Sequence, residues 1–398
     1  MPQSNIDPLS PTVGYSNLGV FQIMGEQYDK AIESFSKAIE LNPEHAAAYT
    51  HRGCAYAMTG ELDKALVDHN KAIALDPEFS SAYYNRGTTQ HKRGNVDTAI
   101  QDYTTSIELD PKRAEVYFCR ATVYNEKGNV NSAIDDYTKA IELHLKLAEI
   151  YEQDADDDIS HDYNPMRELK LKLAKVYKHR GLAYYSIGEY HQAINDFSAL
   201  IAYRPNNTLA YYNRGVAYHS SGMFDKAIND YNTAISRYPD KPKFYNNRGI
   251  TYHSKGEIAK AIEDYNTAIE LDPDTLETYS NRGIAYRDKG AYDQAIADFT
   301  KTIELNPEIV IAYYNRGTVY HMKGDYEQAI EDYTKAIELK PHNADAYYRR
   351  SRAWLYLGEE EKAKSDMKTA SDIRINTTTA IDEILRDYDR AWKTLGNL

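Results

Sequence analysis

Residues 310–343 read VIAYYNRGTVYHMKGDYEQAIEDYTKAIELKPHN, and this stretch decides the fold. It contains two segments whose apolar residues recur at helical spacing, with Gly324 between them and Pro341 after the second. Glycine readily adopts the left-handed conformation that ends a helix, and a proline disfavours helical backbone in the residue before it. The stretch therefore predicts a helix, a turn and a second helix.

The same pattern recurs along the chain every 34 residues. The tripeptide NRG begins at Asn213, Asn247, Asn281 and Asn315, each 34 residues after the one before. This spacing defines ten repeats, within which positions are numbered 1 to 34. The repeats begin at Thr12, Ala46, Ser80, Ala114, Ala174, Thr208, Pro242, Leu276, Val310 and Ala344.

Three positions of the repeat carry small residues. Position 20 is alanine in all ten repeats, and position 8 is glycine in eight, with Ala121 and Ser351 as the exceptions. Position 15 is glycine in nine repeats, with Glu26 as the exception. Small residues at positions 8 and 20 predict that the two helices meet there. One hairpin cannot bury its own apolar face, so the hairpins are expected to stack.

In period and in the placement of small residues and proline, the chain resembles the tetratricopeptide repeat family over residues 12–377. The resemblance implies an all-α fold, an α–α superhelix in the form of a right-handed solenoid. The expected divisions are a flexible N-terminal tail (1–11), repeats 1–4 (12–147), an insertion with extended helices and an acidic loop (148–173), repeats 5–10 (174–377) and a C-terminal capping helix (378–398).

Positions 7 and 23 carry opposite charges. Repeats 2 to 10 have arginine at position 7 and aspartate at position 23, whereas repeat 1 has Leu18 and Ser34. A lone buried charge is costly and a paired one is tolerable. We therefore expect ion pairs between the two helices of a repeat or between neighbouring repeats. The alternative is a basic ladder that binds acidic ligands.

Composition limits the partners and the compartment. The 398-residue chain has a formal net charge of −13, which disfavours nucleic acid and favours neutral or basic protein or peptide partners. The two cysteines, Cys54 and Cys119, cannot staple a chain of this size, and no secretory signal or membrane-spanning apolar run is present. The sequence predicts a cytoplasmic protein without a cofactor.

The insertion offers one weak metal signal. Asp154, Asp156 and Asp158 have the alternate spacing of a calcium-binding loop. However, Ile159 stands where such a loop needs glycine, and Pro165 stands where it needs glutamate. An exposed polar loop is therefore favoured over a metal site.

The resemblance to the family also implies a binding surface. It places positions 2, 5, 6, 9, 12 and 13 on a concave groove formed by the first helices. Position 6 there is similar to the asparagine ladder of some family members, which holds a peptide backbone through amide donors and acceptors. Asparagine on a wet surface is the alternative. The candidate peptide-binding residues are Asn85, Asn213, Asn247, Asn281 and Asn315 at position 6, Tyr84, Tyr212, Tyr314 and Tyr348 at position 5, and His219, His253 and His321 at position 12.

Position 5 and position 12 each leave an alternative open. The tyrosines are binding anchors or part of the core between repeats. The histidines predict a pH-responsive groove rather than a metal site, because no third ligand is evident.

These observations predict a protein–protein interaction scaffold that holds an extended peptide or a partner helix. One alternative is a co-chaperone or targeting adaptor with a partial carboxylate clamp at Lys178, Asn213 and Lys243, in which Leu182 and Asn247 depart from the pattern. Another is a self-assembling structural solenoid. An enzyme is not expected, since the sequence lacks GxxxxGK[ST], HExxH and GxSxG motifs.

Overall fold

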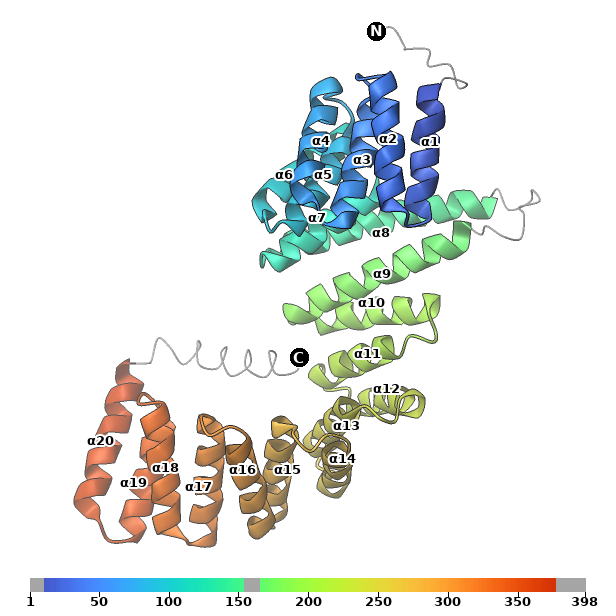
Figure 1. The fold of residues 1–398 in the computed structure, drawn as a ribbon. Coiled ribbons are helices and arrows are strands. Elements are labelled where there is room, and N and C mark those ends of the chain that lie inside the picture. Colours follow the sequence, from blue (N-terminus) through green and yellow to red (C-terminus); the bar gives the residue numbers. More distant parts are fainter. Residues whose placement is uncertain (1–10, 154–164, 377–398) are drawn as a thin grey trace. The chain divides into compact units, whose positions relative to one another are not determined.

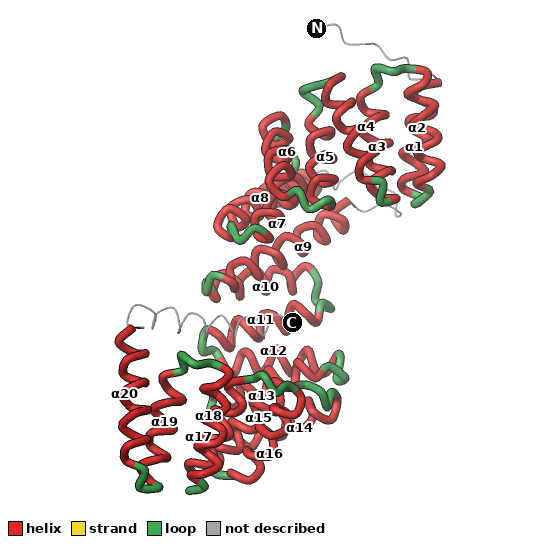
Figure 2. The backbone as a smooth tube through the Cα atoms, turned by 60° about the vertical axis from the view of Figure 1, so that its left-hand side comes forward, coloured by secondary structure: helices red, strands yellow, loops and turns green. Residues whose placement is uncertain are grey.

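The computed structural model describes residues 11–153 and 165–376. Within these ranges the regular secondary structure is entirely α-helical, with twenty helices (Figures 1 and 2). The expected N-terminal tail apart from Pro11, the acidic loop with Asp154, Asp156 and Asp158, and the expected capping helix lie outside the described residues.

The chain divides into two compact units, with the boundary between Asn206 and Asn207. The first unit contains α1 (Pro11–Met24), α2 (Tyr28–Leu41), α3 (Ala46–Thr59), α4 (Leu62–Leu75), α5 (Ser80–Lys92), α6 (Val96–Leu109), α7 (Ala114–Glu126), α8 (Val130–Gln153), α9 (Pro165–Ser186) and α10 (Tyr190–Tyr203). Within it, consecutive helices pack against each other from α1 to α10.

The second unit contains five hairpins of nearly uniform length. Its helices are α11 (Thr208–Ser220), α12 (Phe224–Arg237), α13 (Pro242–Ser254), α14 (Ile258–Leu271), α15 (Leu276–Lys289), α16 (Tyr292–Leu305), α17 (Val310–Lys323), α18 (Tyr326–Leu339), α19 (Ala344–Tyr356) and α20 (Glu360–Asn376). Consecutive helices again pack together, and each first helix also contacts the first helix of the next repeat.

The turn between the two helices depends on position 15. All nine glycines there have positive φ values, from 77° at Gly222 to 93° at Gly324. This is the left-handed region that glycine enters without a steric penalty. The prediction that glycine ends the first helix is confirmed. Glu26 takes the same place in repeat 1 and has a φ of 57°.

The glycine at position 8 allows the two helices of a hairpin to approach closely. A Cβ atom built on Gly249 would lie 2.7 Å from Cε1 of Tyr265 and 3.2 Å from the carbonyl oxygen of Ala261. The alanines at position 20 are at most 1% exposed in every repeat. The predicted need for small residues at both positions is confirmed.

In nine of the ten repeats the core of the hairpin is one large ring at position 24, whereas the last repeat has the exposed Met367 there. Eight repeats have a fully or almost fully buried tyrosine or phenylalanine there. These are Phe35, Tyr103, Tyr137, Phe197, Tyr231, Tyr265, Phe299 and Tyr333. Repeat 2 has His69 at this position, 0% exposed and with neither ring nitrogen hydrogen-bonded to a described residue.

Two long helices, α8 and α9, connect repeats 4 and 5. They pack against each other, and Leu169 and Leu173 of α9 are buried in the same cluster as Tyr137 and Ile141 of α8. The added length of α9 therefore carries apolar side chains into the core of the first unit.

The arginines at position 7 form the expected ion pairs. In all nine repeats that have it, the guanidinium donates from Nε and Nη2 to the two carboxylate oxygens of the aspartate at position 23, at 2.6 to 2.9 Å. The aspartates are buried, between 3% and 7% exposed. The hypothesis of an ion pair between the two helices of a repeat is confirmed.

The arginines of these pairs also lie over one or two tyrosine rings and are hydrogen-bonded to the preceding repeat. The guanidinium of Arg248 lies 5.7 Å from the ring centre of Tyr245 and 5.9 Å from that of Tyr252. Its Nη1 atom donates to Oδ1 of Asn232, at position 25 of the repeat before, at 2.6 Å. The same bond to position 25 joins Arg52 to Ser36, Arg86 to Asn70, Arg120 to Thr104, Arg180 to Thr138, Arg282 to Asn266, Arg316 to Thr300 and Arg350 to Thr334.

Candidate functional site

The candidate binding residues lie on the first helices, and at Asn247 and Asn281 position 6 contacts position 5 of the repeat before. Nδ2 of Asn247 donates to the hydroxyl of Tyr212 at 2.6 Å, and Nδ2 of Asn281 donates to Oδ1 of Asn246 at 3.1 Å. Each of these two asparagines donates one amide hydrogen to its neighbour. A side-chain amide has two hydrogens and an accepting oxygen. The contact aligns adjacent first helices and leaves further capacity for a ligand.

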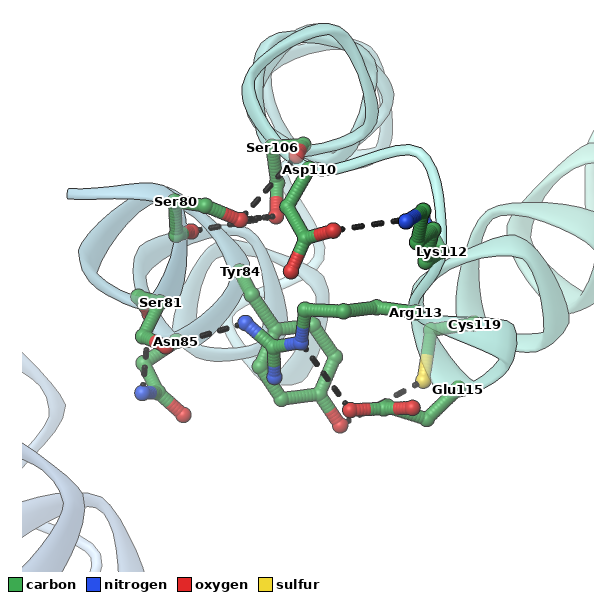
Figure 3. A network of polar contacts seen from close by, with 10 residues as sticks. All are labelled: Ser80, Ser81, Tyr84, Asn85, Ser106, Asp110, Lys112, Arg113, Glu115 and Cys119. Atoms are coloured by element: carbon green, nitrogen blue, oxygen red, sulfur yellow. Dashed lines mark hydrogen bonds and ion pairs between the residues drawn. The ribbon is translucent and has the colours of Figure 1, made fainter. Parts of the chain in front are cut away.

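The equivalent residues of the first unit take part in a polar network (Figure 3). The hydroxyl of Tyr84 lies 3.8 Å from Sγ of Cys119, and the Arg113 guanidinium lies 5.0 Å from the Tyr84 ring centre. Arg113 also donates to Ser81 at 2.9 Å and to Glu115 at 3.0 Å. Tyr84 is therefore held by the next repeat.

The remaining position 6 asparagines differ in their surroundings. Asn85 donates to the carbonyl oxygen of Ser81, within its own helix, at 2.9 Å. Asn213 is half-buried, whereas Asn315 is only 7% exposed. The five asparagines share a position in the sequence, but the structure gives them different partners and different access to solvent.

The position 5 tyrosines also divide by exposure. Tyr212 is 8% exposed and packs against Tyr231 and Phe244, so it belongs to the core between repeats. Tyr84 and Tyr314 are half-buried, and Tyr348 is 38% exposed. The periodicity could not separate these cases, because exposure depends on which residue the next repeat places alongside.

The position 12 histidines mostly contact the following repeat. Nδ1 of His219 lies 3.0 Å from Oγ1 of Thr251, and burial lowers the pKa of His219. Nε2 of His253 lies 3.0 Å from Oδ2 of Asp288 at the surface. His321 contacts the rings of Tyr326 and Tyr356 edge-on. Within residues 11–153 and 165–376, no three histidine, cysteine or acidic side chains gather as a metal site would require.

The partial clamp residues are distributed over both units. Lys178 is half-buried on α9 of the first unit, and Asn213 and Lys243 lie on α11 and α13 of the second. Lys243 is an exposed residue, and its Nζ atom lies 5.0 Å from the ring centre of Tyr212.

Position 9, which the family resemblance places in the groove, carries half-buried aliphatic residues, Val216, Ile250 and Ile284. One set of side chains, at position 25, was not predicted from the sequence. Position 25 carries the acceptors for the arginines, and it is serine, threonine or asparagine in nine repeats. The last repeat has Lys368 there instead, with no further arginine at position 7 to follow. The change to lysine at position 25 in the one repeat that no arginine follows was the sequence signal that could have revealed the role of position 25.

No helix of the described ranges has both the length and the apolar character needed to cross a lipid bilayer.

The solved structures that resemble the chain include MamA, which is 29% identical with a TM-score of 0.40 over 42% of this chain and 96% of that one. The Cut9–Hcn1 hetero-tetramer of APC/C is 16% identical with a TM-score of 0.43, over 94% of this chain and 96% of that one. PilF of Pseudomonas aeruginosa is 16% identical with a TM-score of 0.44, over 56% and 99%. A search of curated proteins found no match.

Family profiles match most of the repeats. Profiles described as "Tetratricopeptide repeat" match residues 80–113, 102–135, 208–241, 230–263 and 310–343. A profile described as "TPR repeat" matches residues 25–60, 53–94, 181–222, 251–287 and 283–324. Together they cover residues 25–135 and 181–343, well over half of the chain. With the helical hairpins, the small residues at their contacts and these matches, the chain belongs to the tetratricopeptide repeat family.

Proposed function

We propose that this protein-interaction scaffold binds an extended peptide or a partner helix along the first helices of its repeats. Repeats of this family are in general binding modules rather than enzymes. The observation that carries the proposal is the pairing of Asn247 with Tyr212 and of Asn281 with Asn246, at positions 6 and 5 of successive first helices. Asn247 and Asn281 keep an accepting Oδ1 after donating to the preceding repeat. Such groups suit the backbone of a peptide, which offers a donor at almost every residue.

Aliphatic side chains flank these polar groups. Ile311 at position 2 is 39% exposed, and Ile250 and Ile284 at position 9 are half-buried. Apolar area beside a few placed polar groups is the usual composition of a ligand site. The net charge of −13 supports a partner that is neutral or basic overall. Cys54 and Cys119 are free thiols, which supports a reducing compartment such as the cytoplasm.

The test is a selection from a random library of displayed twelve-residue peptides against the immobilised full-length protein. Peptides that are enriched are then measured by fluorescence anisotropy with the wild type and with Asn281→Ala and Ile311→Asp. We expect each substitution to weaken binding at least tenfold, because the first removes an amide and the second places a charge in an apolar contact.

Lys335→Gln is the matched control, because Lys335 is an exposed residue of a second helix, α18. It is expected to leave affinity within twofold of the wild type. Circular dichroism confirms that all variants are folded. Enrichment of no peptide, or equal affinity for wild type and both groove variants, would reject the proposal.

Self-association is a second candidate, favoured by the outer surface of α1. Leu18, Phe21 and Met24 are 45%, 74% and 80% exposed and recur every three residues. The outer surface of a terminal repeat is usually polar. We propose that two copies cover this apolar strip. Sedimentation velocity over a range of concentrations should show a dimer for the wild type and a monomer for Phe21→Asp. A monomeric wild type at all concentrations would contradict it.

A further inference from the structure

The end of the second unit has an unusual concentration of exposed apolar side chains. On α19, Tyr348, Leu355 and Tyr356 are 38%, 49% and 59% exposed. Met322, near the end of α17, is 49% exposed. We call these four residues and Arg352 the α17/α19 surface. Positions 348, 352, 355 and 356 are spaced four, seven and eight residues apart, so they lie on one face of α19.

Aromatic contacts hold part of this surface in place. The rings of Tyr356 and Tyr326 stack in parallel, with centroids 4.7 Å apart and an interplanar angle of 4°. His321 contacts both rings edge-on, at 5.2 Å and 5.4 Å. A rigid aromatic side chain loses little entropy when a partner binds, so the stack is a prepared anchor.

The charge of the surface is opposite to that of the whole chain. Arg352 is exposed and makes no ion pair with another residue of the described ranges. Arg349 lies one turn away and donates from Nε to the hydroxyl of Tyr314 at 2.9 Å. Asp345, one turn before Arg349, is the acidic group whose charge acts on it. Burial lowers the pKa of His321, and the charges of Arg352 and Arg349 lower it further, so His321 is neutral at pH 7.

We propose that the α17/α19 surface binds a partner segment in which Asp or Glu stands next to large apolar residues. A carboxylate would pair with the Arg352 guanidinium, which offers several donors in a fixed plane. The apolar side chains of the segment would cover Tyr356, Leu355 and Met322. Aromatic and arginine residues that become buried together are the usual centres of binding energy in protein interfaces. The inference rests on the proposed function and assigns the chemistry of the partner at repeats 9 and 10.

The experiment uses the same displayed twelve-residue library and the full-length protein. We expect enriched peptides to combine Asp or Glu with Leu, Ile or Phe. We expect Arg352→Glu and Tyr356→Ala each to weaken the binding of these peptides at least tenfold. Arg352→Lys keeps the positive charge and should weaken binding less than Arg352→Glu does. Lys335→Glu is the control, since it makes the same charge reversal on the exposed side of α18 and should change affinity less than twofold.

Three results would overturn the inference. One is the enrichment of only those peptides that lack Asp and Glu next to large apolar residues. Another is equal affinity of the enriched peptides for the wild type and Arg352→Glu. If Asn281→Ala still weakens the binding of these peptides, the proposed function stands and only the assignment of the α17/α19 surface is lost. The third is that acidic peptides are enriched on the full-length variant Ile384→Asp but not on the wild type. That result would assign the surface to residues 377–398 of the chain itself.

Discussion

Arg316 and Thr300 belong to adjacent repeats, and Nη1 of Arg316 donates a 2.9 Å hydrogen bond to Oγ1 of Thr300. The same guanidinium holds both carboxylate oxygens of Asp332, at 2.9 Å and 2.7 Å. One side chain of α17 therefore joins α16 of the preceding repeat and α18 of its own. Because each repeat of a solenoid contacts only its neighbours, such links determine how far unfolding of one repeat spreads to the next.

Replacing Arg316 should destabilise the second unit. Arg316→Gln leaves Asp332, whose side chain is 7% exposed, as a buried carboxylate without its partner. Breaking a buried pair typically costs about 3 to 5 kcal/mol, and because Arg316 is 19% exposed we expect about 2 to 3 kcal/mol. Urea unfolding measures the loss, and hydrogen exchange should locate it in α16, α17 and α18.

Thr300→Val separates the two roles of the arginine. It removes only the acceptor of the preceding repeat and should cost about 1 kcal/mol. The additional hydrogen exchange caused by Thr300→Val should appear where repeats 8 and 9 meet. If Arg316→Gln and Thr300→Val cost the same, the ion pair with Asp332 contributes nothing and this interpretation is wrong.

His69 should make the first unit sensitive to acid. Burial lowers its pKa to about 4, from an ordinary value of 6.5, with a smaller contribution from Arg86. Between about pH 6.5 and pH 4 the unfolded chain binds the proton and the folded chain does not. Stability therefore falls as the pH falls through this window, by about 3 kcal/mol in total.

His69→Phe removes this sensitivity and matches position 24 of repeats 1, 5 and 8, which carry Phe35, Phe197 and Phe299. The variant should unfold at a higher temperature than the wild type, and the difference should be larger at pH 5 than at pH 7. His191→Asn, at an exposed position of α10, is the control and should follow the wild type at both pH values. If the difference in unfolding temperature between His69→Phe and the wild type is the same at pH 5 and pH 7, the proposed titration of His69 is wrong.

Two glycine-to-alanine substitutions should change stability in opposite directions. The Cβ atom of Gly249→Ala would lie 2.7 Å from Tyr265, so the helices must separate, at a cost of about 1 to 3 kcal/mol. Gly14 in α1 has no atom within 4 Å of a built Cβ, and alanine there should stabilise by about 0.5 to 1 kcal/mol. Thermal unfolding of both variants measures the signs. A stabilising Gly249→Ala would show that the hairpin is looser than its contacts indicate.

Glu26→Gly should stabilise repeat 1. Glu26 has a φ of 57°, in the region where nine other repeats have glycine. A side chain in this conformation costs about 1 kcal/mol, although glycine also raises the entropy of the unfolded chain. We expect a net gain of about 0.5 kcal/mol, seen as slower hydrogen exchange in α1 and α2. Faster exchange in the variant would mean that the turn carries no strain.

Much of the architecture followed from residues that act locally. Gly324 ends a helix because of its own backbone freedom, and Pro341 stops the next one because of its ring. Gly249 and Ala261 had to lie at a helix contact because only small side chains recur there. The pairing of Arg316 with Asp332 was also predictable, since repeat 1 lacks both charges and a buried charge requires a partner.

The candidate site was less predictable for a physical reason. Tyr212 and Tyr348 occupy the same position of the repeat, yet one is buried against Phe244 and the other is exposed. Asn247 donates to a tyrosine and Asn85 to its own helix, because their neighbours differ. The sequence alone determined the helices, their turns and their charge pairs, since these depend on each repeat and its spacing. Only the tertiary structure decided which side chains stay accessible, because exposure depends on contacts with the adjoining repeat.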